Sequence, residues 1–196
     1  MVTALAPTRR YTIDDLDQFP DDRKFRELVD GQVVEWDLPS QEHGMLETEL
    51  SGELRQFVKQ HRLGRVSTGD GMVRILGSVH HARGGDIEFF RVGNYPQDAR
   101  AAATVTVPDF VIEIISPTDR ADLVLDKVRD WLRAGVRLLW YINPETGVTT
   151  VYRGDRVSHV AGDEVLDGGD VLPGLKLRLR DILNELAVDG VDSAGV

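Results

Sequence analysis

Two long stretches of the chain repeat apolar residues at the spacing of an amphipathic helix. Ser40 is suited to cap the first, which is expected to run to about His61 with Gly64 just beyond it. The second is expected from about Ala121 to Ala134, closing at Gly135. Their apolar stripes are Leu46, Leu50, Leu54, Phe57 and Val58 in the first helix, and Leu123, Val124, Val128, Trp131 and Leu132 in the second. Two short helices are predicted, one from the Thr12 cap to Pro20 and one over roughly Leu179 to Leu186.

Strands are predicted where shorter apolar or alternating runs end at turn residues. The predicted strands are Phe25 to Asp30, Gln32 to Leu38, Arg65 to Thr68, Met72 to Leu76, a strand beginning at Asp86, Phe110 to Ile115, Arg137 to Ile142, Val148 to Arg153 and Arg156 to Val160. Asp30-Gly31 and Gly154-Asp155 indicate hairpins. The almost wholly apolar run 110–115 is typical of a central strand covered on both faces. Asn94 to Thr106 is expected to be a surface loop, and His80-His81 a solvated turn.

Strands that alternate with helices predict a single α/β domain. The chain has 196 residues and shows no internal repeat or linker. We expect a tail over residues 1–10, one domain over 11–187 and a frayed tail over 188–196. Hydrophobic residues make up 41% and charged residues 29%, as in soluble globular proteins.

The composition of the chain limits its expected cellular location and the kinds of site it can contain. No apolar run approaches the roughly 20 residues needed to span a bilayer, so no membrane partner is expected. The first eight residues lack the pattern of a secretory signal, and a cytoplasmic location is expected. With no cysteine, disulfides, thiolate metal sites and cysteine catalysis are excluded. The net charge of −10 argues against tight nonspecific nucleic-acid binding, which would need a local arginine patch or bound cations.

Glu113 is the residue least suited to its surroundings, because it interrupts the apolar run 110–115. An unpaired carboxylate there would cost several kcal/mol, roughly, unless a cation or hydrogen-bond donors meet it. It shares a strand face with Val111 and Ile115. Two interpretations stay open: a structural pair with one arginine, or a ligand of a metal ion. Asp109 lies about 13 Å along the strand, too far to join Glu113 on one ion.

Lys127 and Asp86 are the next candidates. Lys127 falls inside the apolar arc of its helix, so its amine either snorkels outward or meets buried carboxylates at the strand ends. Asp86 follows Gly84-Gly85 at the start of a strand, and an ordinary loop aspartate is the alternative.

Glu27 and His43 are weaker candidates. Glu27 alternates with Phe25 and Val29 and points either inward or to an exposed edge. His43, near a helix N-terminus, could contact a phosphate, orient a carboxylate or be a structural histidine.

The order of these residues resembles the Uma-two family, a branch of the PD-(D/E)XK nuclease superfamily, over roughly Tyr11 to Leu186. The landmarks are Phe25-Arg26-Glu27-Leu28-Val29-Asp30-Gly31, Ser40-Gln41-Glu42-His43-Gly44, Gly85-Asp86-Ile87, Pro108-Asp109-Phe110-Val111-Ile112-Glu113-Ile114-Ile115-Ser116-Pro117, Lys127, Ala134-Gly135-Val136, Trp140-Tyr141-Ile142-Asn143-Pro144 and Asp170-Val171-Leu172-Pro173-Gly174. The resemblance implies a restriction-endonuclease-like α/β fold, with a central mixed β-sheet flanked by helices.

The resemblance also implies a site. Asp86, Glu113 and the main-chain carbonyl of Ile114 would bind Mg²⁺ or Mn²⁺, with Glu27 as an additional acid. The superfamily usually places its lysine two residues after the acid, where this chain has Ile115, and the resemblance points to Lys127 as a migrated lysine. Gly85 also stands where the family often has proline.

The leading hypothesis is therefore a metal-dependent endonuclease acting on DNA. His43 would support the ligands or face a phosphate, and a homodimer is expected by analogy. One alternative is a non-catalytic binding or dimerisation module of the same fold. Another is hydrolysis of RNA or a different phosphate ester.

Overall fold

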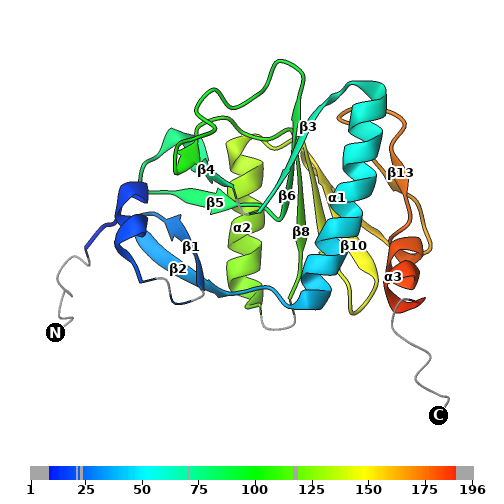
Figure 1. Cartoon of the computed structure of the whole chain (residues 1–196), viewed down its shortest axis with the longest axis horizontal. Helices are drawn as coiled ribbons and strands as arrows, with labels where there is room; N and C mark the ends of the chain where they lie inside the picture. Colours follow the sequence, from blue (N-terminus) through cyan, green and yellow to red (C-terminus); the bar gives the residue numbers. More distant parts are fainter. Residues whose placement is uncertain (1–8, 21, 23, 70, 117–118, 189–196) are drawn as a thin grey trace, which may run out of the picture.

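The computed structural model describes residues 9–20, 22, 24–69, 71–116 and 119–188 (Figure 1). Its elements are η1 Ile13–Gln18, β1 Lys24–Val29, β2 Gln32–Asp37, α1 Gln41–His61, β3 Gly64–Thr68, β4 Met72–Arg74, η2 Ile75–Gly77, β5 Ala82–Gly84, β6 Ile87–Arg91, β7 Ala103–Thr104, β8 Phe110–Ile114, α2 Ala121–Ala134, β9 Leu138–Asn143, β10 Val148–Arg153, β11 Arg156–Val160, β12 Leu166–Asp167, β13 Lys176–Leu177 and α3 Leu179–Val188. The tails expected over 1–10 and 188–196 lie almost entirely outside the described residues, as does Pro117.

A mixed six-stranded sheet forms the centre of the molecule, in the order β11-β10-β9-β8-β6-β3. Strands β8 and β9 run parallel, whereas β6 pairs with β8 in the antiparallel sense. All five residues of β8 are buried, which confirms the central strand predicted from its apolar run. The predicted mixed α/β architecture is confirmed.

The helices cover the two faces of this sheet, and the alternation of β8 decides which residue meets which helix (Figure 1). Phe110 and Ile112 pack on the face covered by α1 and α3. Val111 packs with Trp131 of α2 on the other face. Glu113 belongs to the second set by the period of two, so its side chain points towards α2.

A second sheet, in the order β2-β1-β5-β4-β7, brings the N-terminal hairpin beside the site. Strands β1 and β2 pair as predicted around Asp30 and Gly31, which have φ values of 50° and 83°. Positive φ at both turn residues is the requirement of a type I′ hairpin turn, which an Asp-Gly pair satisfies.

Four details differ from the sequence-based prediction. The expected solvated turn at His80-His81 is wrong for His81, which is buried and leads into strand β5. The expected loop 94–106 contains the buried short strand β7, and the short pair β12–β13 was not predicted. Predicted strand 72–76 ends at Arg74 and continues as the 3-10 turn η2.

Helix α1 ends at His61, as predicted, and Arg62 rather than a glycine adopts the left-handed cap conformation, at φ 54°. Gly64 instead begins β3, where an added Cβ would lie 2.1 Å from the main-chain oxygen of Phe90. Strand pairing therefore requires this glycine. No helix among the described residues is long and apolar enough to cross a bilayer.

Candidate active site

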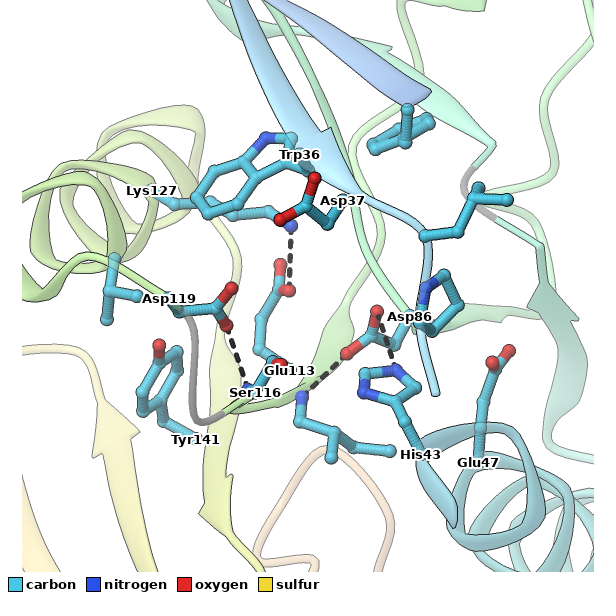
Figure 2. A pocket seen from close by; sticks show the side chains of 15 residues that line it. Trp36, Asp37, His43, Glu47, Asp86, Glu113, Ser116, Asp119, Lys127 and Tyr141 are labelled. Carbon is cyan, nitrogen blue, oxygen red and sulfur yellow. Dashed lines mark hydrogen bonds and ion pairs between the residues drawn. The ribbon is translucent and has the colours of Figure 1, made fainter. Parts of the chain in front are cut away.

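A pocket opens where β8 ends, between α1, α2 and the β1–β2 hairpin (Figure 2). Its cavity measures about 90 Å³, whereas a single water needs roughly 10–15 Å³. The space therefore suits one hydrated ion. The lining residues are Phe25, Trp36, Asp37, Leu38, Pro39, His43, Glu47, Asp86, Glu113, Ile114, Ser116, Asp119, Val124, Lys127 and Tyr141.

Asp86 is fixed against the end of the central strand. Its Oδ2 accepts a hydrogen bond of 2.6 Å from the main-chain N–H of Ile114. The N–H and C=O of one strand residue point to the same edge, so the carbonyl of Ile114 faces the edge where Asp86 lies. The other oxygen, Oδ1, lies 3.6 Å from Nε2 of His43. A carboxylate and a main-chain carbonyl are thus brought to one wall of the pocket.

Glu113 meets two donors, both from α2. Trp131 donates its indole N–H to Oε1 at 2.6 Å, and Nζ of Lys127 lies 2.8 Å from Oε2. Burial raises the pKa of Glu113 to about 8, against the opposing charge of Lys127 and with a further increase from Asp86. Asp86 and Glu113 both line the pocket, and the negative charge of Asp86 disfavours the ionised form of Glu113.

Lys127 holds a positive charge in this buried setting. Burial alone would lower its pKa, but the carboxylates of Glu113, Glu27 and Asp86 raise it above its usual value. Of the two alternatives for Lys127, outward snorkelling or contact with buried carboxylates, the structure shows the contact. Of the two interpretations left open for Glu113, the pair with one arginine is not what the structure shows, because its charged partner is this lysine.

Glu27 is fully buried, and both of its oxygens have donors. Oε1 accepts from the N–H of Gly84 at 3.0 Å and lies 3.4 Å from Lys127. Oε2 accepts from Trp36 Nε1 and from Arg83, each at 2.8 Å. Glu27 therefore contacts Lys127 without lining the pocket, and the amine lies within reach of both Glu27 and Glu113.

A chain of buried ionic contacts continues from Glu27 to the surface. Arg83 bridges Glu27 and Asp130, with its Nε 2.9 Å from Oδ2 of Asp130. His81 donates to the same oxygen at 2.8 Å, and its other ring nitrogen lies 3.1 Å from the exposed Asp30. The hydrogen bond to Asp130 raises the pKa of His81 against the effect of burial. Sequence reasoning missed this network because strand β5 was not predicted.

Several pocket residues were not predicted from the sequence. Asp119 caps the main-chain N–H of Ser116 at 2.9 Å, and its pKa is raised by burial. Burial, with the nearby charge of Glu113, raises the pKa of Tyr141, so its hydroxyl stays protonated. Asp37 and Glu47 complete the acidic lining. In the sequence these residues are marked only by lying near the predicted landmarks. Nearness along the chain does not show where a side chain points.

The donor set fits a hard divalent cation. Five carboxylates line the cavity against a single lysine. No three Asp, Glu or His side chains group as metal ligands in the part of the chain that the structure describes. A hard divalent cation such as Mg²⁺ takes oxygen ligands and keeps several waters, and Asp86 and Glu113 are the carboxylates that would hold it here. Each oxygen of Glu113 has one donor and keeps a second lone pair for an ion.

A mixed sheet that delivers two carboxylates to one pocket beside a lysine defines a restriction-endonuclease-like architecture. The fold matches a crystal structure described as a "putative nuclease belonging to DUF820" from Anabaena variabilis ATCC 29413. The TM-score is 0.76 at 22% identity, over 89% of this chain and 98% of the other.

The family model "Putative restriction endonuclease", Uma2, matches residues 13–180, and the chain belongs to this family. Family and fold together indicate a restriction-endonuclease-like nuclease. No curated protein matches the chain.

Proposed function

We propose that this protein is a Mg²⁺- or Mn²⁺-dependent endonuclease that hydrolyses phosphodiester bonds in DNA. The observation that carries the proposal is the convergence of Asp86, Glu113 and Ile114 on one small cavity, with Lys127 only 2.8 Å from Glu113. When bound there, a divalent ion would lower the pKa of a ligated water and offset charge on the phosphate.

The residues of the chain have distinct parts in this mechanism. Asp86 and Glu113 hold the ion, and Trp131 fixes the orientation of the Glu113 carboxylate through its 2.6 Å hydrogen bond. Lys127 stays charged and donates to the attacking water or to the developing anion. Glu27 positions Lys127, and its own charge is balanced by Arg83. His43 orients Asp86 from the N-terminal end of α1.

The position of Lys127 bears on the alternative of a non-catalytic module. Ile115 occupies the place of the usual lysine, which by itself favours loss of activity. In the structure, an amine from α2 reaches the same carboxylate, so a cation is supplied from another element. Lys127 of α2 would therefore take the part of the lysine that is missing at position 115.

The test is a nicking assay on supercoiled plasmid with Mg²⁺ or Mn²⁺, comparing wild type with Asp86→Ala and Glu113→Ala. Asp109→Asn is a matched control, since Asp109 is also buried beside β8 but binds Arg91 and Asn94 at the other end of the strand. We expect wild type and the control to nick DNA and both site variants to lose activity by more than a hundredfold. Equal nicking by all four proteins would reject the site.

Substrate class and assembly are tested alongside. Single-stranded RNA and a dinucleotide, offered under the same conditions, distinguish a ribonuclease or a general phosphodiesterase from a DNA endonuclease. The expected homodimer stays a prediction, and light scattering during size-exclusion chromatography measures it directly.

A further inference from the structure

A second hollow, of about 520 Å³, lies at the far end of α1 from the acidic pocket. Its lining residues are Arg55, Val58, Lys59, Arg62, Gly64, Arg65, Val66, Val92 and Tyr95, which we call the basic groove. Four of these side chains are cationic and none is acidic. On a chain with a net charge of −10, such a gathering of one sign is unexpected.

The cations of the basic groove are not used for ion pairs within the described residues. Arg55, Lys59 and Arg62 are exposed, and Arg65 instead stacks over the ring of Tyr95 at 4.6 Å. Their neighbour Arg91 shows the contrast, because its guanidinium lies 3.1 Å from Asp109 and it does not line the groove. Arginine stacked on an aromatic ring keeps its donors free for an external anion.

The dipole of helix α1 does not account for the clustering of the four cations in the basic groove. Lys59 and Arg62 lie at the C-terminal end of α1, where positive charge is favourable. Arg55, however, lies nearly two turns before that end, and Arg65 comes from β3, which begins after the helix. Four like charges around one hollow repel each other, so an anionic ligand would stabilise the arrangement.

Helix α1 contributes residues to both hollows, and its course is seen in Figure 1. His43, near its start, lines the acidic pocket, while Arg55 and Arg62 lie 12 and 19 residues further on. At about 1.5 Å per residue these positions are roughly 18 and 28 Å from His43. One turn of duplex DNA is about 34 Å long, so one bound duplex could reach both hollows.

The face of α1 between the hollows offers no bulky obstacle. At 100° per residue, Gly44, Thr48 and Ser51 lie in line with Arg55 and Lys59. A Cβ added at Gly44 would meet nothing within 4 Å, so packing does not explain this glycine. The absence of a side chain there would let a ligand backbone approach the helix.

We propose that the basic groove binds the sugar–phosphate backbone of a DNA duplex whose scissile bond lies in the acidic pocket. The inference rests on the proposed function and adds where the substrate is held. Because the pocket is lined by carboxylates, affinity for a polyanion must come from cations elsewhere on the surface. The basic groove supplies these cations, and its distance from the acidic pocket is less than one turn of duplex DNA.

The test compares two triple variants of equal charge change in binding a fluorescent 20-base-pair duplex, measured by anisotropy in EDTA. Arg55→Gln/Lys59→Gln/Arg65→Gln alters the basic groove and leaves the helix cap at Arg62 intact. Arg129→Gln/Arg133→Gln/Arg156→Gln is the control, on the outer face of α2 and on β11, the sheet edge opposite β3. We expect the groove variant to bind at least tenfold more weakly. The salt slope of log K should fall by about 2–3, at roughly 0.9 for each phosphate that the variant no longer neutralises.

The outcomes separate this inference from the proposed function. Equal binding by both triple variants, or no binding by wild type, overturns the proposal that the basic groove binds DNA. Binding of poly-glutamate but not DNA, with the same dependence on the groove, also overturns it by assigning the surface to an acidic protein. Metal-dependent nicking of plasmid by wild type but not by Asp86→Ala tests the acidic pocket, whereas duplex binding in EDTA tests the basic groove without metal. Absence of nicking rejects the proposed function even where groove-dependent DNA binding is observed.

Discussion

Nζ of Lys127 lies 2.8 Å from Oε2 of Glu113, although one residue comes from the helix α2 and the other from the central strand β8. The contact exists because Glu113 shares the strand face of Val111, against which α2 packs. Burial favours the neutral form of both groups, but the lysine is surrounded by three carboxylates and stays charged. The pair thus combines structural support with the cation that the proposed chemistry requires.

Lys127→Met should disable this site while keeping the length of the side chain. Loss of one partner of a buried pair typically costs about 3–5 kcal/mol. We expect lower stability in urea denaturation and at least a hundredfold loss of nicking activity. Arg129→Met, an exposed change on the same helix, should alter neither. Full nicking by Lys127→Met would show that the amine takes no part in the reaction.

Divalent metal should stabilise the folded protein through Asp86 and Glu113. A ligand that binds only the folded state at 100 times its Kd contributes about 2.7 kcal/mol. We expect Mn²⁺ to raise the Tm of wild type and of Asp109→Asn, but not of Asp86→Asn. Isothermal calorimetry gives a second readout that does not depend on activity. A Tm increase of equal size in Asp86→Asn would place the ion elsewhere.

Arg83 is the residue whose loss should destabilise the fold most strongly. It is 1% exposed and contacts both Glu27 and Asp130, so Arg83→Met removes one cation from each of two buried carboxylates. The expected cost is about 3–5 kcal/mol by chemical denaturation. Arg129→Met is the control, since its side chain is 70% exposed and its partner Asp126 is 53% exposed, and exposed pairs contribute only about 0.2–1 kcal/mol. Similar losses of stability in the two variants would contradict the assignment.

His81 should make stability depend on pH. Its two ring nitrogens both face carboxylates, which favours the doubly protonated ring and raises its pKa above the usual 6.5. A group with a raised pKa in the folded state stabilises fully below its unfolded pKa, and this contribution is lost as pH rises through the folded pKa. The urea midpoint of wild type should therefore fall between pH 6.5 and mildly alkaline pH.

The matched control for this prediction is the adjacent histidine. His81→Gln should flatten the fall of the urea midpoint, whereas His80→Gln, at a ring whose Nδ1 binds the main-chain oxygen of Tyr11, should keep it. Parallel curves for His81→Gln and wild type would show that the His81 contacts do not govern the pH dependence.

Several parts of the site could be predicted from the sequence because they depend on local periodicity. The place of Glu113 inside an apolar run and of Lys127 inside an apolar arc both fix a direction for the side chain. Periodicity does not show which charge each one meets. The pairing of Glu27 with Arg83 was hidden because β5 has three residues, too few for an alternating pattern.

The sequence by itself determined the central strand, the long helices and the places of Glu113 and Lys127 among apolar residues. These follow from periods of two and 3.6 residues, which are properties of neighbouring positions along the chain. Only the tertiary structure decided that Asp86 binds the N–H of Ile114, that His81 is buried and that Arg55 and Arg65 share one groove. Those contacts join segments far apart in the chain, and their partners are set by sheet order and helix packing.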